Sequence, residues 1–193
     1  MNFANINDNI ISKQWKDRYD GLTQKTKVRI DELKNQNPIS HQLQVIKKTR
    51  VYPKIGDMFI LKPTDSVQLR GIVVNNHINN LNGDDLLLIL IFNDGVDIEH
   101  CIKKGVTSKD LLIRPAMVGK EYWTRGYFST INNIDIGLNL TNIGFYSVMK
   151  KKILNEYGKE ILVEPELLGI YGVSTITGIG LEVKTELIIK DLI

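Results

Sequence analysis

Pro53-Lys54-Ile55-Gly56-Asp57-Met58-Phe59-Ile60, followed after a loop by Arg70-Gly71-Ile72-Val73-Val74, is the stretch of sequence that decides the fold. Both segments are short apolar runs bounded by turn-forming residues, a pattern typical of β-strands. Gly-Asp before one apolar strand and Arg-Gly before another is how small SH3-like barrels often open. Neither segment contains a nucleophile, a metal-ligand cluster or a phosphate-binding loop. The residues themselves therefore favour a binding protein over an enzyme.

The next part of the chain continues this strand pattern. Leu86 to Phe92 is an unbroken apolar run, which predicts a central strand buried on both faces. Asn93-Asp94-Gly95 is a turn signal, and we expect it to join this strand to a second one, Val96 to Ile102, in a hairpin. Pro115 marks Leu111 to Val118 as an edge strand or a connection. Further on, Tyr122–Trp123 and Tyr127–Ile131 read as two short strands around Gly126.

Helical periodicity is confined to the two ends of the chain. Apolar residues recur at helical spacing over residues 10–34, with a break expected at Asp20-Gly21 and an end before Pro38. A second short helix is predicted from Ser40 to Lys48. Residues 164–170 read as a connection. The tail, Ser174 to Ile193, fits both a helix and one face of a strand, and a helix capped near Ser174 is favoured.

These elements predict an α+β fold in two parts. Residues 1–50 form an N-terminal helical arm, and residues 51–193 form a β-rich domain that is a mostly antiparallel sheet or an SH3-like barrel. A fold of this kind hosts many functions, so it assigns none.

Charge is distributed unevenly between these two parts. The whole chain of 193 residues carries a net charge of +3, too small to imply a nucleic-acid partner. Residues 1–54 hold 11 Lys and Arg against 5 Asp and Glu, whereas residues 55–193 hold 14 against 17. The basic arm is either a solvated helix or a surface that meets an acidic partner.

Cysteine content and hydropathy predict a cytoplasmic protein that does not cross a membrane. The single cysteine, Cys101, excludes an intrachain disulfide and suits a reducing compartment. We see no signal peptide, and the longest apolar run has seven residues, far fewer than the roughly 20 that a membrane span requires.

Few residues form patterns that carry chemistry. Glu99-His100-Cys101 lies on a predicted strand, where consecutive side chains diverge, so we expect no metal site, no catalytic dyad and no cofactor. Asp97 and Glu99 would share one face of that strand, as a glycosidase-type carboxylate pair, a cation site, a charged binding patch or an ordinary solvent-facing surface. Trp123, Arg125 and Tyr127 are residue types that anchor protein interfaces or stack on nucleic-acid bases. Trp123 could equally lie in the hydrophobic core.

The order and spacing of several motifs resemble those of the immunity protein 26 family. The resemblance covers roughly residues 52–185 and rests on the two opening strands, on Leu112-Ile113-Arg114-Pro115-Ala116, on Trp123-Thr124-Arg125-Gly126-Tyr127-Phe128, and on Glu164-Pro165 followed by Leu168-Gly169-Ile170-Tyr171-Gly172-Val173-Ser174. It implies a bacterial immunity protein that binds a cognate protein toxin and blocks it stoichiometrically, without catalysis.

A toxin-binding surface can be suggested on this basis. It comprises exposed charge on the expected hairpin and interface-type residues after it: Asp94, Asp97, Glu99, Trp123, Arg125 and Tyr127. The helical arm would cap the domain, touch the toxin or form a homodimer. The alternative function is an RNA-binding or RNA-cleaving SH3-like barrel that uses Arg70 with Thr64 or Ser66, although the acidic balance of residues 55–193 would repel phosphate.

Overall fold

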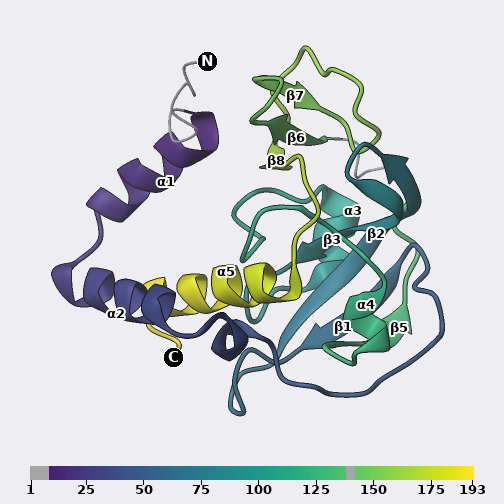
Figure 1. Cartoon of the computed structure of the whole chain (residues 1–193). Coiled ribbons are helices and arrows are strands. Elements are labelled where there is room, and N and C mark those ends of the chain that lie inside the picture. The colour runs from purple at the N-terminus through teal and green to yellow at the C-terminus, as the bar shows by residue number, and fades with distance from the viewer. Residues whose placement is uncertain (1–8, 138–141) are drawn as a thin grey trace.

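A five-stranded antiparallel sheet forms the centre of the α+β fold, which a computed structural model describes for residues 9–137 and 142–193 (Figure 1). The strands are β1 (Asp57–Leu61), β2 (Leu69–Asn80), β3 (Gly83–Ile91), β4 (Ala116–Val118) and β5 (Phe128–Asn133), and they lie in the order β4-β3-β2-β1-β5. The two opening strands and the edge position near Pro115 are thus confirmed. Within the described ranges no pairing joins β4 to β5, so a closed barrel is not established.

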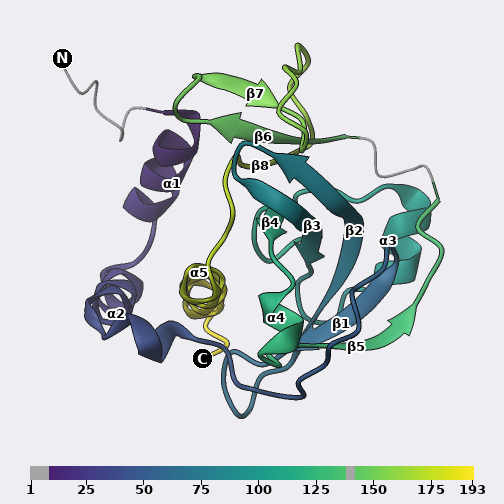
Figure 2. The ribbon, with the colours of Figure 1, turned by 45° about the vertical axis from the view of Figure 1, so that its right-hand side comes forward.

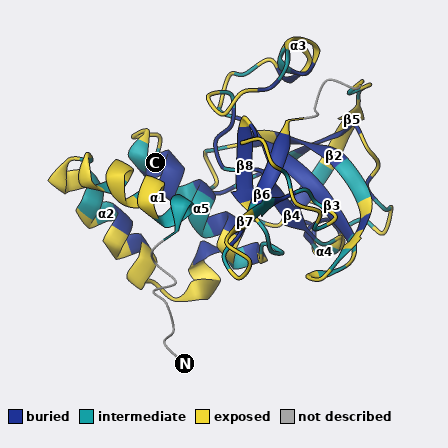
Figure 3. Ribbon diagram, turned by 90° about the horizontal axis from the view of Figure 1, so that it is seen from above, coloured by how far each residue is buried: buried dark blue, intermediate teal, exposed yellow. Residues whose placement is uncertain are grey.

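Both faces of this sheet are buried. Along β3, Leu87, Ile89 and Ile91 belong to one apolar cluster, and the alternating residues Leu86, Leu88 and Leu90 belong to another. A strand with apolar side chains on both faces needs cover on both, which explains the unbroken apolar run. The buried strands are dark blue in Figure 3, whereas the outer surfaces of the helices are largely exposed.

Two helices cover the first face. The long helix α5 (Ile176–Ile189) buries Ile179, Val183 and Leu187 in the cluster that contains Leu87, and the single turn α4 (Glu121–Thr124) adds Trp123. Thr175 caps α5 by accepting a hydrogen bond from the Gly178 N–H at 3.1 Å, so the helix predicted for the tail is confirmed. Figure 2 looks along α5 and shows it between α2 and the sheet.

The second face is covered by α3 (Ile98–Lys104) and by a small sheet in the order β7-β6-β8. Its strands are β6 (Ile143–Ser147), β7 (Lys152–Leu154) and β8 (Leu167–Ile170). β8 pairs with β6 in parallel, so the prediction that residues 164–170 form only a connection is wrong. This strand forms because Leu167 and Leu168 are buried.

The predicted hairpin after β3 is also wrong. Asn93 to Gly95 does turn the chain, but the residues after the turn form the helix α3. The Asp97 carboxylate accepts a hydrogen bond from the His100 N–H at 3.1 Å and caps the helix. Ile98 and Ile102, one helical turn apart, are both buried. The cap and this spacing favour a helix over the strand that alternation had suggested.

The arm consists of α1 (Ile10–Asp20), α2 (Gln24–Asn35) and a 3₁₀ turn, η1 (Pro38–His41). The predicted break near Gly21 and the end before Pro38 are confirmed. The helix predicted from Ser40 to Lys48 is wrong, because residues 44–49 hydrogen-bond to backbone carbonyls of distant segments, among them that of Gly126. Ile30 and Leu33 of α2 pack against Ile188 of α5.

Helices account for 29% of the structure and strands for 28%, so the predicted β-rich character is not established. The division of the chain at residues 50 and 51 stays a prediction.

Candidate functional site

The three acidic residues predicted to form part of a binding surface lie at the start of α3. Asp94 and Glu99 are exposed, and Asp97 is occupied as the helix cap. The expectation that Asp97 and Glu99 share a strand face is wrong, because this segment is helical.

The aromatic part of the predicted surface is largely interior. Trp123 is 1% exposed and Tyr127 is 8% exposed, whereas Arg125 is exposed. The Trp123 ring packs edge-on against Phe59 and Phe128, and its Nε1 donates a hydrogen bond to the Thr130 hydroxyl at 3.1 Å. Trp123 belongs to the cluster on one face of the sheet, and α3 packs on the other. The six residues therefore do not form one surface.

The residues named for the RNA alternative lie near the start of the sheet. Arg70 is an exposed residue of β2, and the Thr64 and Ser66 hydroxyls lie 3.3 Å apart in the preceding loop. The structure records no contact of the Arg70 side chain with either hydroxyl among the residues that it describes.

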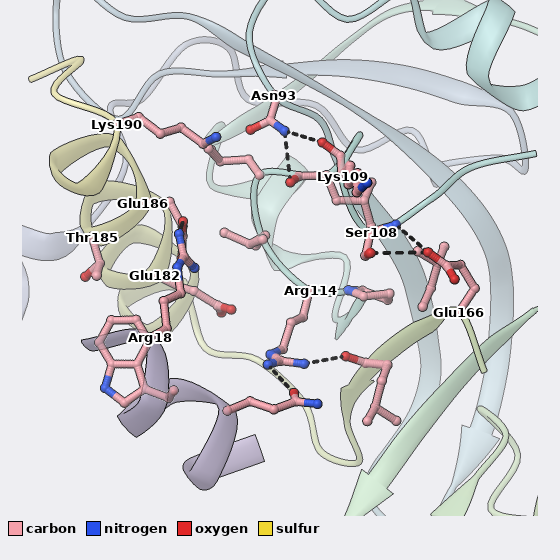
Figure 4. A pocket seen from close by; sticks show the side chains of 18 of the residues that line it. Arg18, Asn93, Ser108, Lys109, Arg114, Glu166, Glu182, Thr185, Glu186 and Lys190 are labelled. Carbon is pink, nitrogen blue, oxygen red and sulfur yellow. Dashed lines mark hydrogen bonds and ion pairs between the residues drawn. The ribbon is translucent and has the colours of Figure 1, made fainter. Parts of the chain in front are cut away.

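A cleft of about 720 Å³ lies between the helical arm, α5 and the segments that precede β4 and β8. Its walls come from parts of the chain that are far apart in sequence. They include Gln14, Trp15 and Arg18 of α1, residues 108–115, residues 164–168, and Glu182 and Glu186 of α5. Figure 4 shows the charged side chains that converge there. Sites for other molecules are most often concave and lie between such structural units.

One wall is held in place by an ion pair between the arm and α5. The Arg18 guanidinium donates two hydrogen bonds of 2.6 Å to the two carboxylate oxygens of Glu186. The Glu186 side chain is only 11% exposed and the Arg18 side chain 45% exposed. Two parallel bonds of this kind fix orientation as well as distance. They matter here because no residue of α1 is fully buried.

Arg114 and Glu182 point into the cleft from opposite walls (Figure 4). The Arg114 guanidinium donates to two neutral acceptors, the Leu168 carbonyl at 3.1 Å and the Gln14 side-chain oxygen at 2.8 Å. Burial lowers the pKa of Arg114 from its ordinary value. Burial also raises the pKa of Glu182 to about 7; Arg114 opposes this rise, and Glu186 adds to it. The cleft thus contains a half-buried cation beside a carboxyl group that titrates near neutrality.

Three exposed lysines add positive charge at the edge of the cleft. The Lys34 Nζ of α2 lies 5.1 Å from the Trp15 ring centroid, whereas the side chains of Lys109 and Lys190 have no hydrogen bond or ion pair within residues 9–137 and 142–193. Lysines without a carboxylate partner are available to a negatively charged molecule.

Sequence reasoning missed this cleft because its residues are brought together only by the tertiary structure. One local signal was present: Glu182 and Glu186 are four residues apart and share a face of the predicted tail helix. Two acidic residues so close to the apolar stripe of α5 indicate basic partners elsewhere in the chain. The sequence does not identify Arg18 and Arg114 as those partners.

A second polar cluster lies at the β2–β3 hairpin. His77 Nδ1 is 2.7 Å from an Asp85 carboxylate oxygen, and the Tyr52 ring stacks on His77 with centroids 4.5 Å apart. Burial raises the pKa of Tyr52 to about 12. The His77 and Asp85 side chains are 66% and 42% exposed. Because both of these side chains are largely open to solvent and neither lines the cleft, this cluster is a weaker candidate than the cleft.

Comparisons with models of protein families, with curated proteins and with solved structures gave no match. Among the described residues, no group of three His, Cys, Asp or Glu side chains is placed to hold a metal ion. A search of the same residues for a helix long and apolar enough to cross a bilayer found none.

Replacing Glu182 with glutamine is expected to stabilise the protein at pH 8 by about 2 kcal/mol. Between pH 4.5 and about 7 the folded chain holds a proton on Glu182 that the unfolded chain has lost, so the stability of the wild type falls as the pH rises through this range. The uncharged glutamine removes this pH-dependent loss of stability. Urea unfolding of the wild type and the variant at pH 4.5 and pH 8 measures the difference in their unfolding free energies.

The stability gained by Glu182→Gln should be small at pH 4.5, where the Glu182 carboxyl is protonated in the folded state. Glu32→Gln, which changes an exposed glutamate of α2, is the control and should leave the unfolding free energy within about 0.5 kcal/mol of the wild type at both pH values. A Glu182→Gln variant less stable than the wild type at pH 8 would contradict this description of the cleft.

Proposed function

We propose that the protein is a bacterial immunity protein that binds a cognate protein toxin in the cytoplasm and neutralises it by stoichiometric contact, without catalysis. The resemblance of residues 52–185 to the immunity protein 26 family supports this proposal. The cleft is the observation that carries it, because its charged walls are held in place before any partner arrives. Tight inhibition is favoured by such pre-organised surfaces, which lose little conformational entropy on binding.

The cleft has the residue types that dominate binding energy at protein interfaces. Trp15, Arg18 and Arg114 lie together in its walls, and Trp and Arg are enriched among interface hot spots. The surrounding lysines supply a charged rim, which speeds encounter with an oppositely charged partner. We therefore assign toxin binding to the cleft in place of the surface that the sequence suggested.

Co-expression of the chain with the product of the adjacent toxin gene, followed by size-exclusion chromatography, tests this function. We expect a stable one-to-one complex and rescue of growth. Separate elution of the two proteins without rescue of growth would overturn the proposal.

Reversing the charge of the three cleft lysines should weaken toxin binding at least tenfold. The variant is Lys34→Glu with Lys109→Glu and Lys190→Glu, and surface plasmon resonance at low and physiological salt measures the affinity. All three lysines are exposed, so the fold should be preserved.

The control variant reverses Lys103, Lys150 and Lys159, which are exposed outside the cleft. It makes the same change in net charge and should bind with an affinity near that of the wild type. Equal losses in the two variants would show that net charge, rather than the cleft, governs binding.

A further inference from the structure

We infer that the cleft takes an acidic polypeptide segment of its partner, and that a carboxylate of this segment pairs with Arg114. This inference rests on the proposed function, because it names the chemistry of the toxin segment that enters the same site. It differs from that proposal in being testable with an acidic peptide in the absence of the toxin.

The Arg114 guanidinium is half-buried, and no carboxylate hydrogen-bonds to it within the described residues. Both of its hydrogen bonds within the described residues go to neutral oxygens, those of Leu168 and Gln14. Buried charges in proteins are normally paired with an opposite charge. Gln14 is an exposed residue of α1, so its amide can leave without opening the core. A ligand carboxylate in its place would form a charge-assisted hydrogen bond, roughly twice as strong as a neutral one.

The nearest protein carboxylates attract Arg114 but do not hydrogen-bond to its guanidinium. Glu186 already has both oxygens occupied by Arg18 at 2.6 Å. Glu182 faces Arg114, but its carboxyl is partly desolvated on the wall of the cleft and titrates near pH 7. A carboxylate that enters beside Glu182 repels the ionised form and favours the protonated one. Binding of an acidic segment therefore takes up a proton from solvent at this carboxyl group.

The remaining charges around Glu182 favour an anion over a cation. Arg18 of α1 and Glu186 of α5 form an ion pair and neutralise each other. The other charged groups that line the cleft are Lys34 on α2, Lys109 before β4, Glu164 and Glu166 before β8, and Lys190 after α5. When Glu182 is protonated, Arg114 and the three lysines outnumber the two remaining glutamates.

The experiment titrates the full chain with acetylated, amidated tetraglutamate by isothermal calorimetry at pH 6 and pH 8. Tetraglutamine of the same length is the uncharged control peptide. We expect tetraglutamate to bind about tenfold more tightly at pH 6 than at pH 8, because a carboxyl group with a pKa near 7 must be protonated in the complex. Tetraglutamine should not bind measurably at either pH.

Three variants separate the cleft from general electrostatic attraction. Arg114→Gln should weaken tetraglutamate binding at least tenfold, whereas Arg70→Gln, an exposed arginine outside the cleft, should leave it unchanged. The Glu182→Gln variant should bind tetraglutamate at pH 8 with the affinity that the wild type shows at pH 6. This result would assign the pH dependence to Glu182 rather than to one of the three histidines of the chain.

Equal binding by wild type and Arg114→Gln, or equal binding of the two peptides, would overturn the inference. So would a toxin complex that keeps its full affinity in Arg114→Gln, and that result would leave the proposed function standing. Failure of the chain to bind or neutralise the toxin, with tetraglutamate still bound through Arg114, would overturn the function alone.

Discussion

Replacing Trp123 with alanine is expected to lower the free energy of unfolding by about 4 kcal/mol. The indole is 1% exposed and packs against Phe59 and Phe128, whose centroids lie 5.3 and 5.1 Å from its own. Its removal leaves a cavity between α4 and the sheet and leaves the Thr130 hydroxyl without its donor. Urea unfolding followed by circular dichroism measures the loss.

Arg125→Ala is the matched control, since Arg125 lies two residues further along on the surface. It should change the unfolding free energy by no more than about 0.5 kcal/mol. A Trp123→Ala variant as stable as the wild type would show that the indole is not part of the core. If stability is lost as expected, any loss of binding to the proposed partner in this variant reports unfolding rather than a missing contact.

Replacing Gly180 with alanine is expected to cost about 3 kcal/mol and to displace the arm from α5. A Cβ at this position would overlap the backbone oxygen of His41, in the 3₁₀ turn η1 at the end of the arm. Backbone atoms cannot rotate away as the end of a side chain can, so η1 and α5 must separate. The measurement is thermal unfolding together with proteolysis between residues 36 and 50.

Gly178→Ala provides the control within the same helix. Its Cβ would meet only the Thr175 hydroxyl, at 3.0 Å, and alanine favours a helix by roughly 1 kcal/mol over glycine. This variant should be as stable as the wild type or slightly more stable. Equal stability of both variants and the wild type would show that η1 does not pack closely against α5 at Gly180.

The sequence predicted elements well wherever local spacing and burial agree. The strand from Leu86 to Phe92 is an example, because a run that is apolar at every position can only be satisfied by cover on both faces. The helical tail and the division between α1 and α2 were predicted for the same reason: an apolar stripe or a glycine determines local structure within a few residues.

The secondary-structure predictions were wrong where a short segment is compatible with both a helix and a strand. Val96 to Ile102 contains alternating residues compatible with a strand, and the cap at Asp97 together with Ile98 and Ile102 decides for a helix. Tyr122 and Trp123 have strand-favouring side chains, yet both are buried in the single turn of α4. Tertiary burial overrides the weak preference of such short segments.

The cleft could not be predicted because it depends on distant pairs. Arg18 and Glu186 are separated by 168 positions, and Gln14 and Arg114 by 100. Each of these residues alone resembles an ordinary surface charge or amide. The packing of α2 against α5 and the bonds of Arg18 and Gln14 together bring α1 over the segment that contains Arg114.

The bond between Arg18 and Glu186 has a consequence for the timing of protein synthesis. A ribosome adds roughly 5–20 residues per second, so the 168 positions between the two partners take roughly 10–30 s to translate. During this interval α1 exists without the helix that holds it, and the cleft lacks the wall that α5 supplies. A nascent chain interrupted before residue 186 therefore cannot form this ion pair, and α1 takes its final position only after α5 has been made.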